Sequence, residues 1–173
     1  NNQIIQWKKK INHLPLKSDE IIQNLSKIDI INSKIGKNHK KWEVIELSGG
    51  NLNQVNLVRG EKGVVCVKQS LPYLRILGPE ATMPLNRLVY EHNTLCKHKT
   101  YISDFIPKVF YFDSKKFLLI FQYFENYKNL REMLILKSKC NFLSNNISSY
   151  LARTIFFSSD LYLKSHERRT EAA

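Results

Sequence analysis

The chain has little that would support a membrane-spanning, disulfide-linked or metal-binding protein. Its three cysteines, Cys66, Cys96 and Cys140, form no CxxC pair and join no histidine at ligand spacing. The five histidines form no HxH or HExxH pattern, so no metal site is expected from this chain. No run of about 18 uncharged apolar residues occurs, and the start "NNQIIQWKKK" lacks the apolar segment of a signal peptide. We therefore expect a cytoplasmic protein with no membrane partner and with reduced, buried cysteines.

The formal net charge of +12 raises the alternative of nucleic-acid binding, because clustered Lys and Arg bind phosphate chains by releasing counterions. The lysines are instead scattered through "WKKK", "GKNHKK", "CKHK" and "DSKK", with no basic stripe interleaved with aromatics. We therefore expect a solvated surface and no nucleic-acid partner. The alternative rests on net charge alone.

The hydrophobic content of 43% is enough for a core, and the apolar pattern divides the 173 residues into strands and helices. Five segments alternate apolar with polar residues or are rich in β-branched and aromatic ones, which predicts strands: residues 42–48, 53–59, 63–69, 108–113 and 116–124. Helical spacing predicts helices at residues 18–25, 84–98, 129–136 and 147–163. The polar residues 32–41 are typical of a linker.

Three features occur in an order that suggests one chemistry. Gly49 and Gly50 lie in the turn between the first two predicted strands, Lys68 ends the third strand, and Glu91 lies in the next helix. This is the order found in the small lobe of a protein-kinase-like phosphotransferase. A glycine turn lets backbone approach a triphosphate, a lysine can bind its α- and β-phosphates, and a glutamate can hold that lysine.

Each feature also has an ordinary structural interpretation when taken alone. "GGN" is a common hairpin turn, Lys68 could be a surface side chain whose stem covers apolar neighbours, and Glu91 could be a solvated helix residue. Their joint order favours a nucleotide-binding lobe. Strand alternation places Cys66 on the same face as Lys68, where an adenine ring could lie. The backbone N–H and C=O groups of Gln122, Tyr123 and Phe124 could form hydrogen bonds with the edge of that ring.

The predicted fold class is α+β. A protein-kinase-like small lobe, made of a five-stranded antiparallel sheet plus a helix, is followed by the first helices of a large lobe. We expect an N-terminal helical extension and linker at residues 1–40, the small lobe at residues 41–124 and the beginning of the helical lobe at residues 125–173.

Several motifs resemble one family, the methylthioribose kinases of the aminoglycoside-phosphotransferase branch. "GGNLNQV" resembles their Asp-Gly-Asn-Leu-Asn loop, and "VKQSLPYLRILG" resembles their lysine strand with its Lys-Gln-x-x-Pro-Tyr extension. "FIPKVFYFD", "NLREMLI" and "LARTIFFSSDL" resemble the following strand and the first large-lobe helices. The resemblance runs from about Pro15 to the end of the sequence.

The resemblance implies ATP-dependent phosphorylation of the 1-hydroxyl of 5-methylthioribose in methionine salvage, with ATP and Mg²⁺ as cofactors and a possible homodimer. Together with the glycine turn, it predicts ATP contacts from Gly49, Gly50, Asn53, Lys68, Gln122, Tyr123 and Phe124. Glu91 matches the family's helix glutamate that supports the lysine. Gly49 stands where the family has Asp, and "GPEATMPL" lacks the family's Ser-Trp before the proline.

The family's His-Gly-Asp-Leu-His loop and Asp-x-Glu motif do not occur in this sequence. Phosphoryl transfer needs such carboxylates, so we predict no catalytic residue and no metal ligand in this chain, and no catalysis by it alone. The predicted helices at residues 129–136 and 147–163 should expose apolar faces. A non-catalytic kinase-like module, retained for nucleotide binding or interaction, is the alternative.

Overall fold

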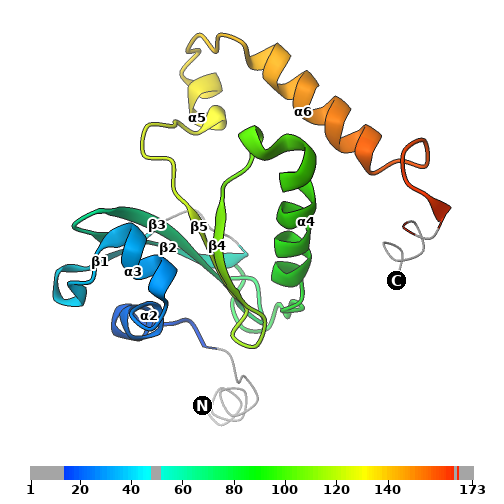
Figure 1. The fold of residues 1–173 in the computed structure, drawn as a ribbon. Coiled ribbons are helices and arrows are strands. Elements are labelled where there is room, and N and C mark those ends of the chain that lie inside the picture. The colour runs from blue at the N-terminus through cyan, green and yellow to red at the C-terminus, as the bar shows by residue number, and fades with distance from the viewer. Residues whose placement is uncertain (1–13, 48–51, 166, 168–173) are drawn as a thin grey trace. The chain divides into compact units, whose positions relative to one another are not determined.

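The computed structural model describes residues 14–47, 52–165 and 167, and the chain divides into two compact units (Figure 1). The first unit comprises Asn1–Thr94 and Pro107–Tyr123, and the second comprises Leu95–Ile106 and Phe124–Ala173. No helix among the described residues is long and apolar enough to cross a membrane.

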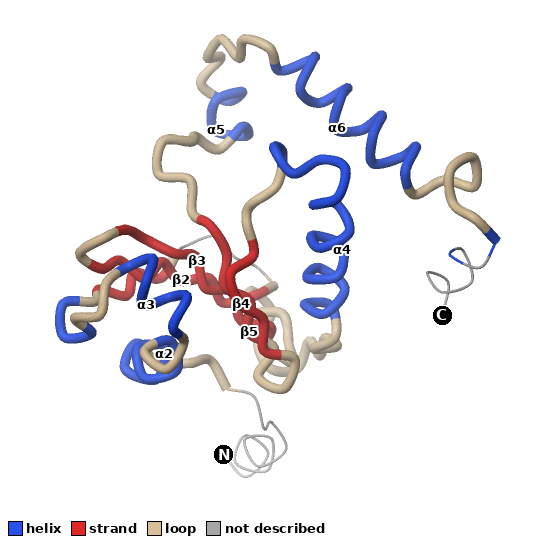
Figure 2. The backbone as a smooth tube through the Cα atoms, in the orientation of Figure 1, coloured by secondary structure: helices blue, strands red, loops and turns tan. Residues whose placement is uncertain are grey.

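A single antiparallel sheet forms the centre of the first unit (Figure 2). Its strands are β1 (Glu43–Glu46), β2 (Asn53–Gly60), β3 (Gly63–Ser70), β4 (Val109–Asp113) and β5 (Leu118–Gln122). The spatial order is β1-β2-β3-β5-β4, so β3 is the middle strand. The predicted α+β class, with a five-stranded antiparallel sheet followed by helices, is confirmed.

Two N-terminal helices cover one face of this sheet. Helices α2 (Ser18–Leu25) and α3 (Asp29–Ile35) lie beside β1 to β3 in Figure 1. Their buried side chains form one core with buried side chains from β2, β3 and β5. The core contains Ile21, Leu25, Ile31, Ile35, Trp42, Val58, Val65, Val67, Leu118 and Ile120. Because strand side chains alternate, the neighbouring residues of β2, β3 and β5 face the other way.

The predicted linker at residues 32–41 is wrong, because this segment contains the end of α3 and the short 3-10 helix η1 (His39–Lys41). Ile31 and Ile35, four residues apart, both lie in the core. Asn32 is buried but satisfied, since its Nδ2 donates to the Ser26 carbonyl at 2.8 Å and its Oδ1 lies 2.8 Å from His39 Nε2. The polar residues around Ile35 concealed the helical pattern from sequence inspection.

Two buried glutamines tie the N-terminal segment to the covered face of the sheet. Gln69 on β3 accepts a hydrogen bond from Leu16 N–H at 2.9 Å and donates to the Leu14 carbonyl at 3.0 Å. Gln54 on β2 donates to the Leu16 carbonyl at 3.0 Å. The glutamine side chains thereby form hydrogen bonds with backbone N–H and C=O groups of residues 14 and 16, which a neighbouring strand would otherwise have to pair.

Helix α4 (Arg87–Ile102) begins in the first unit and ends in the second. It starts three residues after Pro84, where the sequence predicted its beginning. The intervening chain forms turns instead, including hydrogen bonds from Leu88 N–H to the Leu85 carbonyl and from Val89 N–H to the Asn86 carbonyl.

The second unit contains the end of α4, the short 3-10 helix η2 (Ser103–Phe105), α5 (Leu130–Ile135) and α6 (Leu143–Phe157). Helix α6 ends six residues before the predicted boundary at Leu163. Near this end, Ser158 Oγ donates to the Thr154 carbonyl and Ser159 Oγ to the Phe156 carbonyl.

As predicted, the helices of the second unit expose apolar side chains, and α5 and α6 contain no buried residue. The exposed apolar side chains on these two helices include Leu134, Ile135, Ile147, Leu151, Ile155 and Phe156. The second unit therefore has far less of a core than the first.

The packing of α3 against the β2–β3 hairpin gives a testable prediction at Gly60. A Cβ at this position would lie 2.1 Å from the Ile35 backbone oxygen, so backbone must move to admit it. We expect Gly60→Ala to lower the free energy of unfolding by about 2 kcal/mol, measured by urea denaturation.

Gly63→Ala is the matched control in the same hairpin, because its Cβ would lie 3.2 Å from the Lys34 carbonyl. It should destabilise by less than about 1 kcal/mol. Equal effects of the two substitutions would contradict the close contact assigned to Gly60.

Candidate functional site

The face of β3 opposite the N-terminal helices carries a close ion pair with α4. Lys68 Nζ lies 2.7 Å from both carboxylate oxygens of Glu91. The lysine side chain is 21% exposed and the glutamate side chain 35% exposed, so water reaches both. In the sheet register, Lys68 is paired with Val55 on β2 and Leu119 on β5. Apolar neighbours on both sides thus hold the lysine stem, and the bidentate carboxylate orients its ammonium group.

Cys66 lies on the same face, two residues before Lys68, and is buried. Burial raises the pKa of the Cys66 thiol to about 12. The charge of Lys68 lowers this pKa, and the charge of Glu91 raises it by less than the effect of Lys68. The thiol therefore stays neutral near pH 7 and acts as a small apolar side chain. The expectation that all three cysteines are buried is wrong, because Cys96 is exposed and Cys140 is partly exposed.

Arg87, one helical turn before Glu91, is a residue that sequence reasoning missed. Its guanidinium donates to the carbonyls of Leu52 at 2.9 Å, Leu71 at 2.7 Å and Pro84 at 2.6 Å. Burial lowers the pKa of Arg87 from its ordinary value, and the group stays charged because an arginine does not deprotonate in proteins.

One signal in the sequence could have identified Arg87. A cation at the start of a helix is unfavourable, because the helix dipole places positive partial charge at that end. An arginine in the first position of α4 therefore requires nearby acceptors. Its spacing of four residues from Glu91 also places both side chains on one face of the helix.

Asn53, a predicted ATP contact, begins β2 and is buried. Its Oδ1 accepts from Arg87 Nη2 at 2.9 Å and from Arg87 Nε at 3.2 Å. The structure thus brings Asn53 and Arg87 together. The predicted loop residues Gly49 and Gly50 lie outside the described residues.

The predicted connector begins at the end of β5. Gln122 N–H donates to the Lys108 carbonyl at 2.8 Å, and Gln122 Oε1 accepts from Lys108 N–H at 3.3 Å. The N–H of Gln122 is therefore engaged within the sheet. Tyr123 ends the first unit and Phe124 begins the second, so the boundary between the units falls within the predicted connector. The ATP-binding roles of these residues stay predictions.

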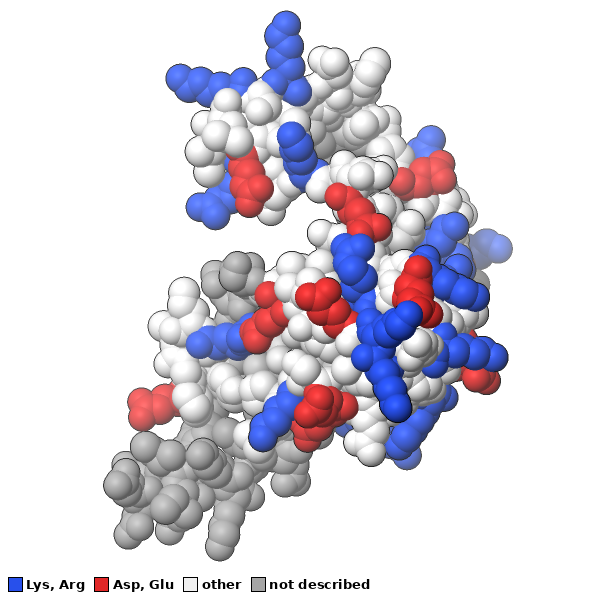
Figure 3. All heavy atoms as spheres, turned by 90° about the vertical axis from the view of Figure 1, so that its left-hand side faces the viewer, with Lys and Arg blue, Asp and Glu red and all other residues white. Residues whose placement is uncertain are grey.

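Charge on the described surface is mixed in sign. On the face drawn in Figure 3, Lys and Arg side chains are interspersed with Asp and Glu side chains. Ion pairs join Lys41 to Glu61 and Arg75 to Glu46. Among the described residues, no three His, Cys, Asp or Glu side chains gather at a position that could hold a metal ion.

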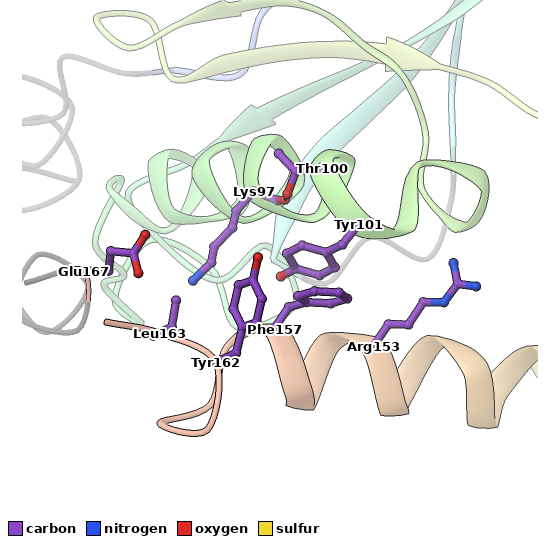
Figure 4. Close-up of a pocket in the computed structure, with 8 residues that line it drawn as sticks. All are labelled: Lys97, Thr100, Tyr101, Arg153, Phe157, Tyr162, Leu163 and Glu167. Carbon is purple, nitrogen blue, oxygen red and sulfur yellow. The ribbon is translucent and has the colours of Figure 1, made fainter. Parts of the chain in front are cut away.

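A separate cavity of about 510 Å³ lies within the second unit (Figure 4). Lys97 and Tyr101 reach it from α4, Arg153 and Phe157 reach it from α6, and Glu167 lies at its edge. The Tyr101 and Phe157 rings stack with centroids 4.8 Å apart. This cavity includes none of the predicted ATP contacts.

Comparison with known proteins identifies similar sequences of one kind. No protein-family model matches the chain. The chain is 33% identical over 135 residues to a methylthioribose kinase of Escherichia coli, covering 78% of this chain and 32% of that protein. It is 28% identical over 160 residues to methylthioribose kinase 2 of Oryza sativa, covering 92% of this chain and 38% of that protein. A methylthioribose kinase of Geobacillus is 32% identical over 127 residues, covering 72% of this chain and 32% of that protein.

These matches confirm the predicted resemblance to methylthioribose kinases. The chain spans about a third of the length of the curated relatives it matches, and the matched part is their N-terminal part.

The raised pKa of Cys66 predicts a difference in thiol reactivity. At pH 8 in the folded chain, we expect iodoacetamide to modify Cys66 about a hundredfold or more slowly than the exposed Cys96, because the reactive species is the thiolate. Peptide mass spectrometry over time measures the two rates.

Denaturing the chain in urea is the control, since unfolding removes the burial and should bring the rates together. Raising the pH from about 8 to about 10 should accelerate modification of Cys66 about a hundredfold, because its thiolate fraction rises tenfold per pH unit below a pKa of about 12. Equal rates in the folded chain would contradict the burial of Cys66.

Proposed function

We propose that this chain is the ATP-binding N-terminal part of a methylthioribose kinase. The whole enzyme would transfer the terminal phosphate of ATP to the 1-hydroxyl of 5-methylthioribose, a step of methionine salvage. The observation that carries the proposal is the Lys68–Glu91 ion pair on the face of a kinase-like sheet that lies opposite the N-terminal helices. The similarity to methylthioribose kinases supports the choice of substrate.

In the proposed site, Lys68 neutralises charge on the α- and β-phosphates of ATP. A phosphate group carries concentrated negative charge, so a lysine fixed before ATP arrives loses little conformational freedom on binding. Glu91 fixes it from α4, and the middle position of β3 in the sheet limits movement of the backbone. Cys66 offers a small neutral surface behind the lysine, as an adenine ring requires.

Mg²⁺ enters this proposal as part of the MgATP complex. Carboxylates that would hold the metal and orient the sugar hydroxyl are needed for transfer. We assign no such role to the described residues, where no cluster of ligands gathers. We therefore propose nucleotide binding for the 173-residue chain, and phosphoryl transfer for the longer enzyme.

The ATP-binding proposal predicts a loss of affinity on removal of Lys68. In a titration with a fluorescent ATP analogue, Lys68→Ala should bind at least about tenfold more weakly than wild type, equivalent to about 1.4 kcal/mol. Glu91→Gln should weaken binding less, because it removes the charge but keeps a hydrogen-bond acceptor for the lysine.

Lys62→Ala is the matched control, since Lys62 is an exposed lysine in the β2–β3 turn of the same unit. It should bind like wild type. If the folded wild-type chain and Lys68→Ala bind the analogue equally, the proposed nucleotide site is wrong.

The substrate part of the proposal is tested in a chimera that joins this chain to the remaining C-terminal part of the Escherichia coli relative. We expect ATP consumption that depends on methylthioribose, and we expect Lys68→Ala to reduce it about a hundredfold or more, because phosphate positioning contributes to the transition state. Full activity of the Lys68→Ala chimera would contradict the role of Lys68.

A further inference from the structure

We infer that Arg87 is a positioning residue. It holds the stem of the first hairpin, which joins β1 to β2 and includes Leu52 and Asn53, against the end of β3 and the start of α4. This inference rests on the proposed function, because Asn53 at that stem is a predicted ATP contact. Arg87 would act through Asn53, not by touching the nucleotide.

The hydrogen bonds of Arg87 join three separate segments of the first unit. One acceptor is the Leu52 carbonyl and a second is the Asn53 side chain, both at the stem of the first hairpin. A third is the Leu71 carbonyl, directly after β3, and a fourth is the Pro84 carbonyl before α4. Leu52 and Leu71 lie 35 and 16 residues before Arg87 in the sequence, and a single guanidinium fixes the spacing of their segments.

The chemistry of the group explains why an arginine is needed here. A guanidinium holds five N–H donors in a rigid plane, whereas a lysine ammonium is a point charge on a flexible stem. Three acceptors, on Leu52, Asn53 and Leu71, lie within hydrogen-bond distance of the two hydrogens on Arg87 Nη2, so at least one hydrogen is shared. With Nε and Nη1 also engaged by the protein, most donors are used before any ligand arrives.

The position of Arg87 on α4 couples the hairpin to the proposed phosphate lysine. Arg87 and Glu91 are four residues apart on one helix face, so the first turns of α4 hold both the hairpin stem and Lys68. The sheet register adds a second link, because Asn53 is paired with Ser70, two residues from Lys68 on the same face. A shift of α4 would thus move the hairpin stem and the lysine together.

Arg87→Lys tests this inference in the full 173-residue chain, because it keeps the positive charge and removes the planar fork. Amide hydrogen exchange is the first measurement. We expect exchange about tenfold faster at Leu47, which donates to the Val55 carbonyl at the hairpin stem, and at Met83, which donates to the Pro72 carbonyl. Exchange at Val67, in the middle of β3, should stay at the wild-type rate.

The second measurement compares fluorescent analogues of ATP and of adenosine. If Asn53 contacts the phosphates, Arg87→Lys should weaken ATP binding about tenfold and change adenosine binding less than about twofold. Arg131→Lys, a like-for-like substitution at an exposed residue of α5, should match wild type in both measurements.

The outcomes separate this inference from the proposed function. A wild-type chain that does not bind ATP overturns nucleotide binding, while the exchange rates still decide whether Arg87 holds the hairpin. Unchanged exchange in both Arg87→Lys and Arg87→Met overturns the inference even if ATP binds.

Equal weakening of ATP and adenosine also overturns it, because that result indicates general destabilisation. Arg87→Met, which removes the charge as well, is included in case the lysine variant retains enough hydrogen bonds. If Arg87→Met stays folded with wild-type exchange and ATP affinity, Arg87 has no positioning role.

Discussion

The alternation of side chains along β3 is the constraint on which the first unit depends. Val65, Val67 and Gln69 face the N-terminal helices, while Cys66 and Lys68 face the opposite side. One face can therefore be dry and closely packed while the other carries a charged group that water still reaches. A slip of one residue in register would place the lysine in the core and remove the apolar side chains that α2 and α3 cover.

The sequence predicts much of this fold because its main signals are local. Each strand of the sheet shows alternation or β-branched enrichment, and the turns between strands contain glycine or polar residues. The linker prediction failed because polar residues surround Ile35, whose burial depends on contacts with distant strands. Arg87 escaped detection for a similar reason: apart from Asn53, its partners are backbone carbonyls, which leave no mark in the sequence. Lys68 and Glu91 were found because their order along the chain is itself a pattern.

The two units differ in how much of their apolar surface is covered. The first unit has a continuous core formed by two helices and the sheet, whereas the exposed apolar side chains are concentrated on α5, α6 and the turns near them. In the proposed enzyme, these faces would meet the part of the large lobe that this chain does not contain. Local opening should therefore begin in the second unit, where helices have few buried contacts to lose.

The glutamine bonds to the N-terminal segment have a consequence for how this protein can be shortened. Gln54 and Gln69 are 6% and 4% exposed, and the backbone of Leu14 and Leu16 provides acceptors and a donor for their amides. A deletion that removes Leu14 to Leu16 would take away all three hydrogen bonds, each of which contributes about 0.5 to 1.5 kcal/mol. Residues 14 to 16 are therefore bound to the sheet and should be kept in a shortened chain.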